Sequence, residues 1–244
     1  MKKIAYFSYG VLSYALFFGT YCYAVGFVTN LLVPTSLDGS SKVSFLKSFL
    51  INASLLLLFA IQHSIMARPA FKKWWISIVP EPIERSTYVL FSSVCMILLL
   101  WLWEPMGGIV WTVEATSLRI ALTALSFLGF GIVLLSTFMI NHFDLFGLRQ
   151  VWFVLRGQPY QPLKFRTPYF YKYVRHPLYI GWIIAFWTAP TMTIAHFLFA
   201  ALCTVYILTA IRFEEKDLIQ TFGEKYIEYK RNAPMLIPFA KSKK

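Results

Sequence analysis

The chain has 244 residues, of which 58% are hydrophobic, 18% aromatic and only 14% charged. This balance lies well on the apolar side of soluble domains, so it excludes an ordinary soluble globular protein and indicates a membrane protein. The formal net charge of +12 does not indicate a nucleic-acid partner, because membrane proteins gather Lys and Arg in their cytoplasmic loops. The sequence also gives no sign of an obligate protein partner.

The amino terminus, Met1-Lys2-Lys3 before an apolar run, resembles a signal peptide but lacks a small-residue cleavage site. We therefore expect a retained first span. The three cysteines, Cys22, Cys95 and Cys203, lie far apart inside apolar segments, a pattern that predicts neither a disulfide nor a metal site.

Apolar stretches along the chain predict the membrane segments. Each must supply roughly 20 helical residues to cross a hydrocarbon core, and the expected spans are 6–33, 45–66, 87–103 and 118–140. Gly129 and Gly131 in the fourth span would allow a neighbouring helix to approach closely.

The last apolar region has a different pattern. The chain re-enters the membrane at Pro177, runs apolar to Trp187, turns at Ala189-Pro190 and returns over 193–211. The first limb is short for a full crossing, so a helical hairpin or a partly re-entrant arm is expected. A charged amphipathic helix should follow, up to Phe222.

Taken in chain order, these elements predict an all-α fold. We expect one polytopic membrane helical bundle over residues 1–244, with about five or six membrane segments, the last two forming the hairpin, plus a cytoplasmic loop and a C-terminal helix. Trp74 and Trp75 beside Lys72 and Lys73 predict an amphipathic segment at the headgroup level between the second and third spans.

The distribution of Lys and Arg predicts the orientation. The amino terminus, the loop after the second span, the stretch 141–175 and the carboxyl tail hold nearly all of these residues. Because positive loops stay in the cytoplasm, we expect both termini on the cytoplasmic side of a cytoplasmic (inner) membrane, next to the long polar stretch.

The most specific motif is Tyr173-Val174-Arg175-His176-Pro177-Leu178-Tyr179-Ile180-Gly181, followed after the hairpin by Glu214-Glu215. Here the sequence resembles the isoprenylcysteine carboxyl methyltransferase and phospholipid methyltransferase superfamily, whose members carry Arg-His-Pro-x-Tyr-x-Gly and then Glu-Glu. The resemblance implies S-adenosylmethionine as cofactor, S-adenosylhomocysteine as product, and a core cofactor region over 141–238. The implied cofactor-binding residues are Tyr173, Arg175, His176, Pro177, Leu178, Tyr179, Gly181, Glu214 and Glu215.

This motif also suits a charged nucleoside on physical grounds. Pro177 restricts His176 to an extended conformation and favours a helix start, and a helix start offers free backbone amides to a carboxylate. Gly181 would permit close approach of the adenine or ribose. Each residue taken singly has a plainer reading, as a snorkelling anchor or a solvated helix end.

A second motif, Asn141-His142-Phe143-Asp144-Leu145-Phe146-Gly147-Leu148-Arg149-Gln150, lies at the end of the fourth span. With Gln62-His63-Ser64 and Glu84-Arg85-Ser86-Thr87-Tyr88, it resembles the membrane-bound bacterial methanethiol S-methyltransferases and the related NnrU-type proteins. The resemblance implies an enzyme that methylates a small thiol, methanethiol, to dimethyl sulfide.

A thiol must lose its proton to become the nucleophilic thiolate. We therefore expect His142 and Asp144, as a pair or bridged by water, to act as general base, and Arg149 to steady the thiolate or the cofactor carboxylate. His63, Arg85 and Tyr88 are weaker candidates for contacts with the substrate. The alternative is that His142 and Asp144 only cap a helix end. No further ligands accompany the His-x-Asp spacing, so no metal is expected.

Three other functions share parts of this pattern. A lipid or prenylcysteine methyltransferase would need a wide lateral opening and would accept long-chain substrates. A sterol-reductase-like enzyme would bind NADPH instead of S-adenosylmethionine. A non-enzymatic NnrU-type membrane protein would tolerate mutation of His176 or Glu214.

Overall fold

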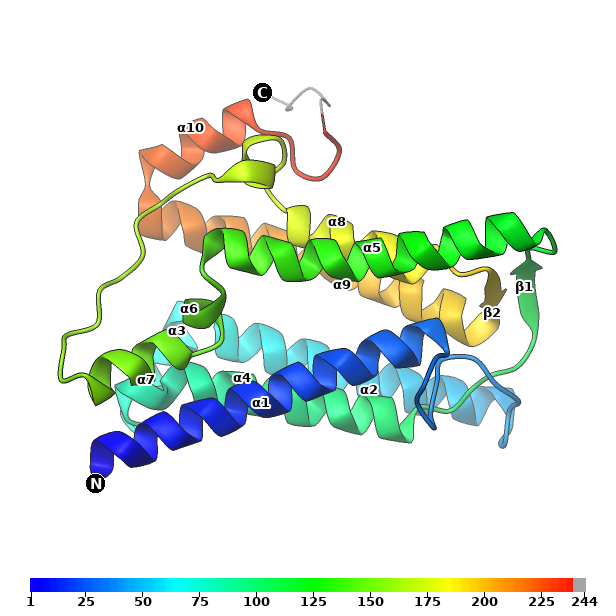
Figure 1. Ribbon diagram of the computed structural model, residues 1–244, viewed down its shortest axis with the longest axis horizontal. Helices are drawn as coiled ribbons and strands as arrows, with labels where there is room; N and C mark the ends of the chain where they lie inside the picture. Colours follow the sequence, from blue (N-terminus) through cyan, green and yellow to red (C-terminus); the bar gives the residue numbers. More distant parts are fainter. Residues whose placement is uncertain (239–244) are drawn as a thin grey trace. The chain divides into compact units, whose positions relative to one another are not determined.

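The computed structural model describes residues 1–238 and is built almost entirely of helices (Figure 1). In chain order its elements are α1 (Lys2–Thr29), α2 (Phe45–Ala67), α3 (Pro69–Trp75), α4 (Glu81–Leu102), β1 (Ile109–Thr112), α5 (Thr116–Ile140), α6 (His142–Leu145), α7 (Leu148–Leu155), the 3-10 helix η1 (Tyr169–Lys172), α8 (Pro177–Trp187), β2 (Thr191–Thr193), α9 (Ile194–Phe222) and α10 (Glu224–Asn232). The predicted all-α class is confirmed.

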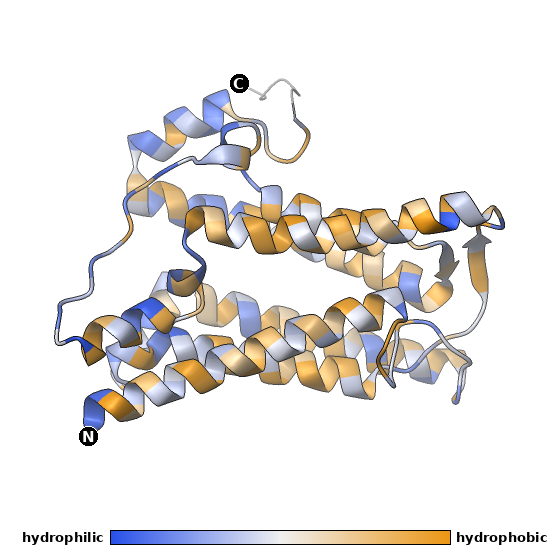
Figure 2. Ribbon diagram, viewed as in Figure 1, coloured by the Kyte–Doolittle hydropathy of each residue, from blue (hydrophilic) through white to orange (hydrophobic). Residues whose placement is uncertain are grey.

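Within residues 1–238, five helices are long and apolar enough to cross a membrane: α1, α2, α4, α5 and α9. Hydrophobic residues colour most of their length in Figure 2, and many large apolar side chains on them are exposed, among them Leu57, Phe127 and Val205. Exposed apolar surface of this kind is expected where helices face lipid, and together with five apolar helices of spanning length it indicates a multi-pass membrane protein.

The helices divide into two compact units. The first comprises Met1–Trp111, His142–Pro162 and Met192–His196. In it α1 and α2 pack against α4, and α7 packs against α1 and α4. The second comprises Thr112–Asn141, Leu163–Thr191 and the chain from Phe197 onward; in it α5 packs along α8.

The packing of α5 on α8 explains two of the glycines. A Cβ on Gly181 would lie 2.7 Å from the Gly129 carbonyl oxygen, and a Cβ on Gly129 would lie 2.6 Å from the Ala185 nitrogen. The close helix approach expected at Gly129 is therefore confirmed. Gly131 has nothing within 4 Å of its Cβ position, so it takes no part in this contact.

The expected C-terminal hairpin consists of α8 and α9. The indole Nε1 of Trp187 donates to Thr204 Oγ1 at 2.9 Å, and the rings of Phe186 and Phe199 meet edge to face at 5.0 Å. With 11 residues, α8 rises only about 16 Å, which is about half of the hydrocarbon core. The short first limb is thus confirmed.

Several predicted boundaries were wrong. The first span ends at Thr29, not at residue 33, because Asn30 adopts a left-handed conformation (φ 57°) that closes the helix. The third begins at Glu81, not at residue 87, since Pro82 fits the first turn of a helix. The charged helix expected after residue 211 is a continuation of α9, and the short β1–β2 sheet was not anticipated.

A polar cluster lies at the start of α9, in the first unit. Asp38 accepts hydrogen bonds from Asn30 Nδ2 and Thr193 Oγ1, and its Oδ2 lies 3.1 Å from Nδ1 of His196, which is 1% exposed. Burial by itself raises the pKa of Asp38, but the hydrogen bonds and the charge of His196 outweigh it and lower this pKa overall. The cluster fastens the loop after α1.

Candidate active site

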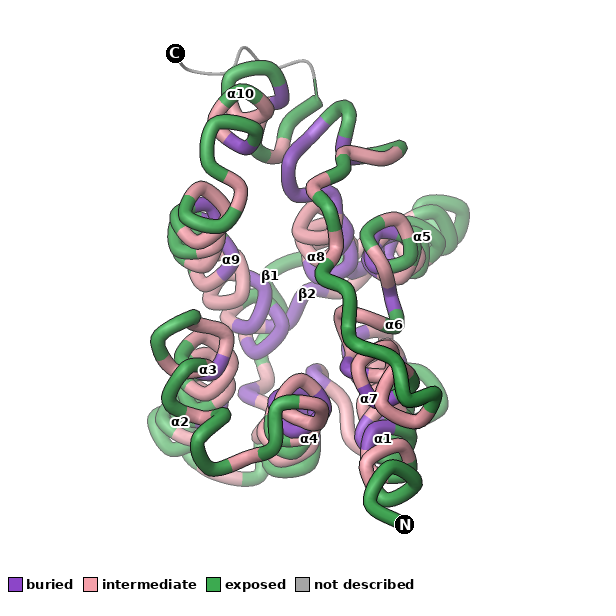
Figure 3. The backbone as a smooth tube through the Cα atoms, turned by 90° about the vertical axis from the view of Figure 1, so that its left-hand side faces the viewer, coloured by how far each residue is buried: buried purple, intermediate pink, exposed green. Residues whose placement is uncertain are grey.

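The predicted cofactor motif enters α8 through a buried segment (Figure 3). The chain after α10 runs beside it: the Arg175 amide donates to the Pro234 carbonyl at 2.9 Å and the His176 amide to the Met235 carbonyl at 3.2 Å. His176 precedes Pro177, which starts the helix, as the sequence predicted. Backbone pairing to the tail therefore holds the basic pair Arg175-His176 in place.

Glu215 on α9 connects this segment to α10. Its Oε1 accepts from Arg175 Nε at 2.7 Å and lies 3.2 Å from His176 Nε2, while its Oε2 pairs with Lys230 Nζ at 2.7 Å. The side chains of Arg175 and Glu215 are both 7% exposed. Since both carboxylate oxygens are engaged by basic groups of the chain itself, Glu215 holds three segments together.

Glu214 has a different environment. Its side chain is 43% exposed, its Oε2 accepts from the Tyr179 hydroxyl at 2.9 Å, and it lies 3.8 Å from His176 Nδ1. A carboxylate that is partly exposed and held by a phenol and an imidazole keeps acceptor capacity for hydroxyl or amine groups of a ligand.

Aromatic side chains of α10 close one side of the cluster. The Tyr229 hydroxyl donates to the Tyr171 carbonyl at 2.5 Å, and Phe165 contacts Tyr226 and Tyr229 ring to ring. Tyr226 is 2% exposed, yet within residues 1–238 its hydroxyl has no hydrogen-bond partner. Burial first, and then the charge of Glu215, raise the pKa of Tyr226, so this hydroxyl stays neutral and can donate to a ligand.

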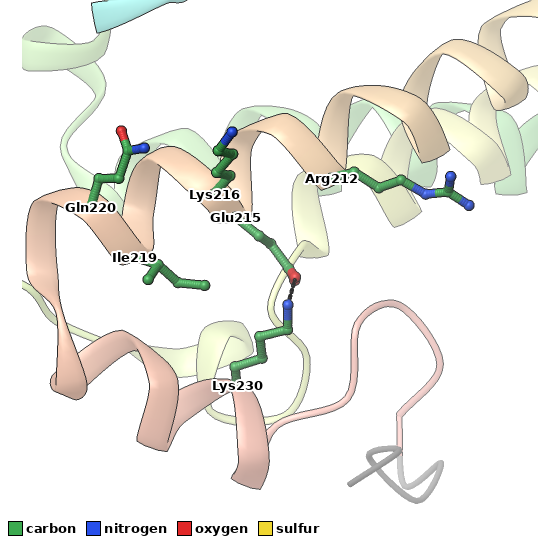
Figure 4. Close-up of a pocket in the computed structure, with 6 residues that line it drawn as sticks. All are labelled: Arg212, Glu215, Lys216, Ile219, Gln220 and Lys230. Atoms are coloured by element: carbon green, nitrogen blue, oxygen red, sulfur yellow. Dashed lines mark ion pairs between the residues drawn. The ribbon is translucent and has the colours of Figure 1, made fainter.

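An open pocket of about 430 Å³ lies between α9 and α10, with Glu215 and Lys230 joined at its side (Figure 4). Its lining residues are Arg212, Glu215, Lys216, Ile219, Gln220 and Lys230. Three of the six are basic and one is acidic, so the pocket favours a ligand that carries a carboxylate.

The remaining residues of the motif have distinct surroundings. Tyr173 is 58% exposed, and Pro177 is buried. Leu178 is half-buried beside Pro177 in the first turn of α8. The small size of Gly181 allows the close contact of α8 with α5. From the sequence alone we expected this glycine to make room for a nucleoside.

The second motif surrounds a buried histidine. His142 opens α6 and is 2% exposed, and its Nε2 lies 2.8 Å from the hydroxyl of Tyr14 on α1. The rings of Tyr14, Phe143 and Phe146 lie 5.6, 5.4 and 4.8 Å from the imidazole. Burial lowers the pKa of His142, so the imidazole is neutral near pH 7 and can accept a proton.

Asp144 binds a different set of partners. Its Oδ1 accepts from Arg149 NH1 at 2.9 Å and from the Tyr160 hydroxyl at 2.9 Å. Residues two apart on a helix do not face each other, and Asp144 stands two after His142. The geometry therefore favours separate roles for these side chains over the pair that the sequence suggested.

The weaker substrate candidates form a chain of contacts leading to α6. His63 lies 2.9 Å from the Tyr88 hydroxyl, measured at Nε2, the Arg85 guanidinium lies over the Tyr88 ring at 4.7 Å, and Arg85 Nε donates to the Leu145 carbonyl at 2.7 Å. The first unit thus brings together all six residues predicted for catalysis and substrate contact, and the second unit holds the nine predicted for the cofactor.

Three residues of these clusters were missed from sequence: Tyr14, Tyr160 and Lys230. Tyr14 lies among other aromatic residues of an apolar helix, and Lys230 is one of several basic residues in the tail, so neither has a distinguishing spacing. Tyr160 is one of many aromatic residues in the stretch 141–175, so it too has no distinguishing spacing. Among residues 1–238, no three His, Cys, Asp or Glu side chains gather as metal ligands.

Comparison with known proteins finds relatives over nearly the whole chain. A methanethiol S-methyltransferase of Crocosphaera subtropica is 54% identical over 231 residues, which cover 95% of this chain and 91% of that protein. Methanethiol S-methyltransferase 1 of Bradyrhizobium diazoefficiens is 50% identical over 240 residues (98% and 84%), and the enzyme of that name from Mycobacterium tuberculosis is 46% identical over 239 residues (98% of each). No family model and no solved structure matches the chain.

Proposed function

Because the chain belongs to the methanethiol S-methyltransferase family, we propose that it transfers a methyl group from S-adenosylmethionine to methanethiol, releasing dimethyl sulfide and S-adenosylhomocysteine. The observation that carries this proposal is the identity of about half of all residues with relatives of that name, extending over both units. It accounts for the two clusters together, one suited to a charged nucleoside and one to a small apolar acceptor.

The second unit offers groups that fit S-adenosylmethionine. Glu214 and the neighbouring Tyr179 would bind ribose hydroxyls or the amino group, the buried Tyr226 hydroxyl would donate to the ligand, and the basic side of the pocket between α9 and α10 would hold its carboxylate. When bound, this cofactor supplies a methyl group on a positively charged sulfur. Arg175, His176 and Glu215 would act by keeping the surrounding segments in place.

The first unit supplies the group that deprotonates the acceptor. We assign the proton of the thiol to His142, which is buried, neutral and surrounded by rings. Asp144 and Tyr160 would hold Arg149 in position to steady a negative charge. Arg85, bonded to the Leu145 carbonyl, would fix α6 from the side of α4.

The same proposal includes the location of the chemistry. Lys and Arg concentrate at the amino terminus, after α2, around α6 to α8 and after α9, which by the positive-inside rule assigns these parts to the cytoplasmic side of an inner membrane. Part of that count, Lys241, Lys243 and Lys244, lies outside the described residues. Methanethiol would arrive from the bilayer or the cytoplasm.

The test is headspace gas chromatography of membranes that contain the chain, supplied with S-adenosylmethionine and methanethiol. Dimethyl sulfide from the parent, and none from equally abundant His142→Ala or Glu214→Ala protein, is the expected result. The control is Glu224→Ala, which removes an exposed carboxylate of α10 and should leave the rate unchanged.

An inactive but well-expressed parent would refute the proposal for methanethiol. Methylation of prenylcysteine or phospholipid by the same membranes would instead indicate a lipid-type acceptor.

A further inference from the structure

Aromatic rings lie around His142 at 4.8–5.6 Å from its imidazole, and the Tyr14 hydroxyl contacts its Nε2. We name Tyr14, Phe143 and Phe146, with Phe17 stacked on Phe146 at 3.8 Å, the aromatic box. Two of its members come from α1 and two from the segment just after α5. Tyr14 and Phe17 are one helical turn apart on α1, so they present neighbouring rings to α6.

We propose that the aromatic box binds the acceptor thiol and sets its size limit, and that Tyr14 is the positioning residue that orients His142 toward the thiol. This inference rests on the proposed function. It adds two things to the proposed function: a surface that binds the substrate, and a role for Tyr14.

The chemistry of the aromatic box suits the binding of a small apolar thiol. Its rings offer polarisable faces and edges, which make favourable contacts with sulfur, and Phe143, at 49% exposed, is the member that an arriving thiol can reach from outside. Phe17 and Phe146 also pack against the buried cluster of Met66, Tyr88 and Val89. That backing restricts how far the inner wall can move to admit a longer chain.

The hydrogen bond between Tyr14 and His142 determines how the imidazole is held. A partner on one ring nitrogen fixes the orientation and the tautomer of an imidazole, and the 2.8 Å contact at Nε2 joins α6 to α1. In the step assigned here Nε2–H of His142 donates to the Tyr14 oxygen, the S–H bond of the thiol breaks, its proton passes to Nδ1 of His142, and its electron pair stays on the sulfur. The neutral imidazole favoured by burial is the form that accepts this proton.

The experiment measures relative rates of methylation of methanethiol, ethanethiol and 1-propanethiol in membranes, with S-adenosylmethionine, by gas chromatography of the methyl thioethers. For Phe146→Ala we expect the ratio of propanethiol to methanethiol rates to rise by roughly 10-fold or more, the usual discrimination for one or two methylene groups in a fitted pocket. Because the ratio does not depend on how much protein folds, it remains informative for a partly unstable variant. Phe146→Leu, a smaller truncation, should shift the ratio in the same direction by less.

The control is Leu12→Ala, which removes a 69% exposed side chain of α1 two positions before Tyr14. Its rate ratio should equal that of the parent. An unchanged ratio in Phe146→Ala, with all three thiols slowed alike, would overturn the size limit.

Tyr14→Phe separates positioning from packing, because it keeps the ring and removes only the hydroxyl. We expect the methanethiol rate to fall by roughly 10-fold at pH 7, within the usual range for a misplaced general base, with the size ratio unchanged. The difference in methanethiol rate between the parent and Tyr14→Phe should become smaller as the pH rises, because more of the thiol then ionises in solution. A deficit that is constant with pH would show a merely structural role and overturn the assignment of Tyr14.

These outcomes separate the two proposals. If the parent methylates methanethiol and the box variants keep its selectivity, the inference fails and the proposed function stands. If the parent methylates none of the thiols, the proposed function fails, and the inference fails with it.

Discussion

Arg175 and Glu215 form a buried ion pair, with 2.7 Å between Nε and Oε1, although they stand 40 positions apart in the chain. Arg175 also donates through NH1 to the carbonyls of Lys230 and Ala233. The pair therefore ties the entry of α8 to the end of α9 and to α10. If either side chain turned to bind a ligand, the contacts between these three segments would weaken.

Replacing Glu215 by Gln should destabilise the protein more than any other single change in the motif. It leaves the buried Arg175 guanidinium without its counter-charge, a change that costs about 3–5 kcal/mol when one partner of a buried pair is lost. Thermal unfolding of the purified protein in detergent measures the difference. Lys230→Ala is the control, with an expected loss below about 1 kcal/mol because Lys230 is 44% exposed. Equal melting of the parent and Glu215→Gln would contradict this view.

Replacing Glu214 by Gln should act on the cofactor and leave the fold intact. We expect S-adenosylhomocysteine to bind about 10-fold more weakly or worse, the effect of losing one hydrogen bond to a charged group, with melting unchanged within error. Isothermal titration calorimetry measures the affinity, and Glu224→Gln on α10 serves as the matched control. Loss of stability together with unchanged affinity would reverse the roles given to Glu214 and Glu215.

The contact of α5 with α8 predicts opposite effects of one substitution at two glycines. Gly129→Ala places a Cβ 2.6 Å from the backbone of α8 and should destabilise the protein by about 1–3 kcal/mol through overpacking. Gly131→Ala, two positions along, meets nothing within 4 Å and should be neutral or stabilise the helix by up to about 1 kcal/mol. Chemical or thermal unfolding of both variants measures the change in stability. Similar losses of stability at the two glycines would argue against this packing of α5 on α8.

The Asp38 cluster predicts how stability depends on pH. The pKa of Asp38 is lower in the folded protein, so its stabilising effect is complete above the unfolded value of about 3.9 and is lost as the pH falls below it. Melting temperatures in detergent between pH 3 and 7 should therefore drop at the acidic end for the parent. The melting temperature of Asp38→Asn should be lower than that of the parent at pH 7 and should fall less toward pH 3. Parallel curves of melting temperature against pH for the two proteins would exclude this contribution of Asp38.

Membrane segments were the most predictable part of the fold, because hydrophobic length is a local property of the sequence. The ends were less predictable. Asn30 closes α1 by adopting a left-handed conformation, but a single asparagine in a run that stays apolar up to Val33 is a weak stop signal. Conversely, α9 continues past Ile211 because charged residues such as Glu214 and Lys216 are good helix formers once the helix leaves the membrane.

The candidate site was partly predictable for a similar reason. Short motifs predicted Glu214, Glu215, His142 and Arg149 as site residues. The structure gives both glutamates and Arg149 polar partners and places His142 among aromatic rings. The motifs did not predict the different roles of Glu214 and Glu215, because the two side chains have the same chemistry. Only their surroundings show that both oxygens of Glu215 are paired and that Glu214 is partly exposed. Tyr14 was not predictable, since its partner lies 128 positions away.

The unbroken length of α9 has a consequence for the choice of membrane. With 29 residues, the helix is about 43 Å long, whereas a hydrocarbon core is about 30 Å thick. Its last turns, which carry Glu214 and Glu215, are a rigid extension of the span and not a loop. A thicker or thinner bilayer would tilt or shift this rod through hydrophobic mismatch, so lipid chain length becomes a variable that sets the depth at which these carboxylates stand.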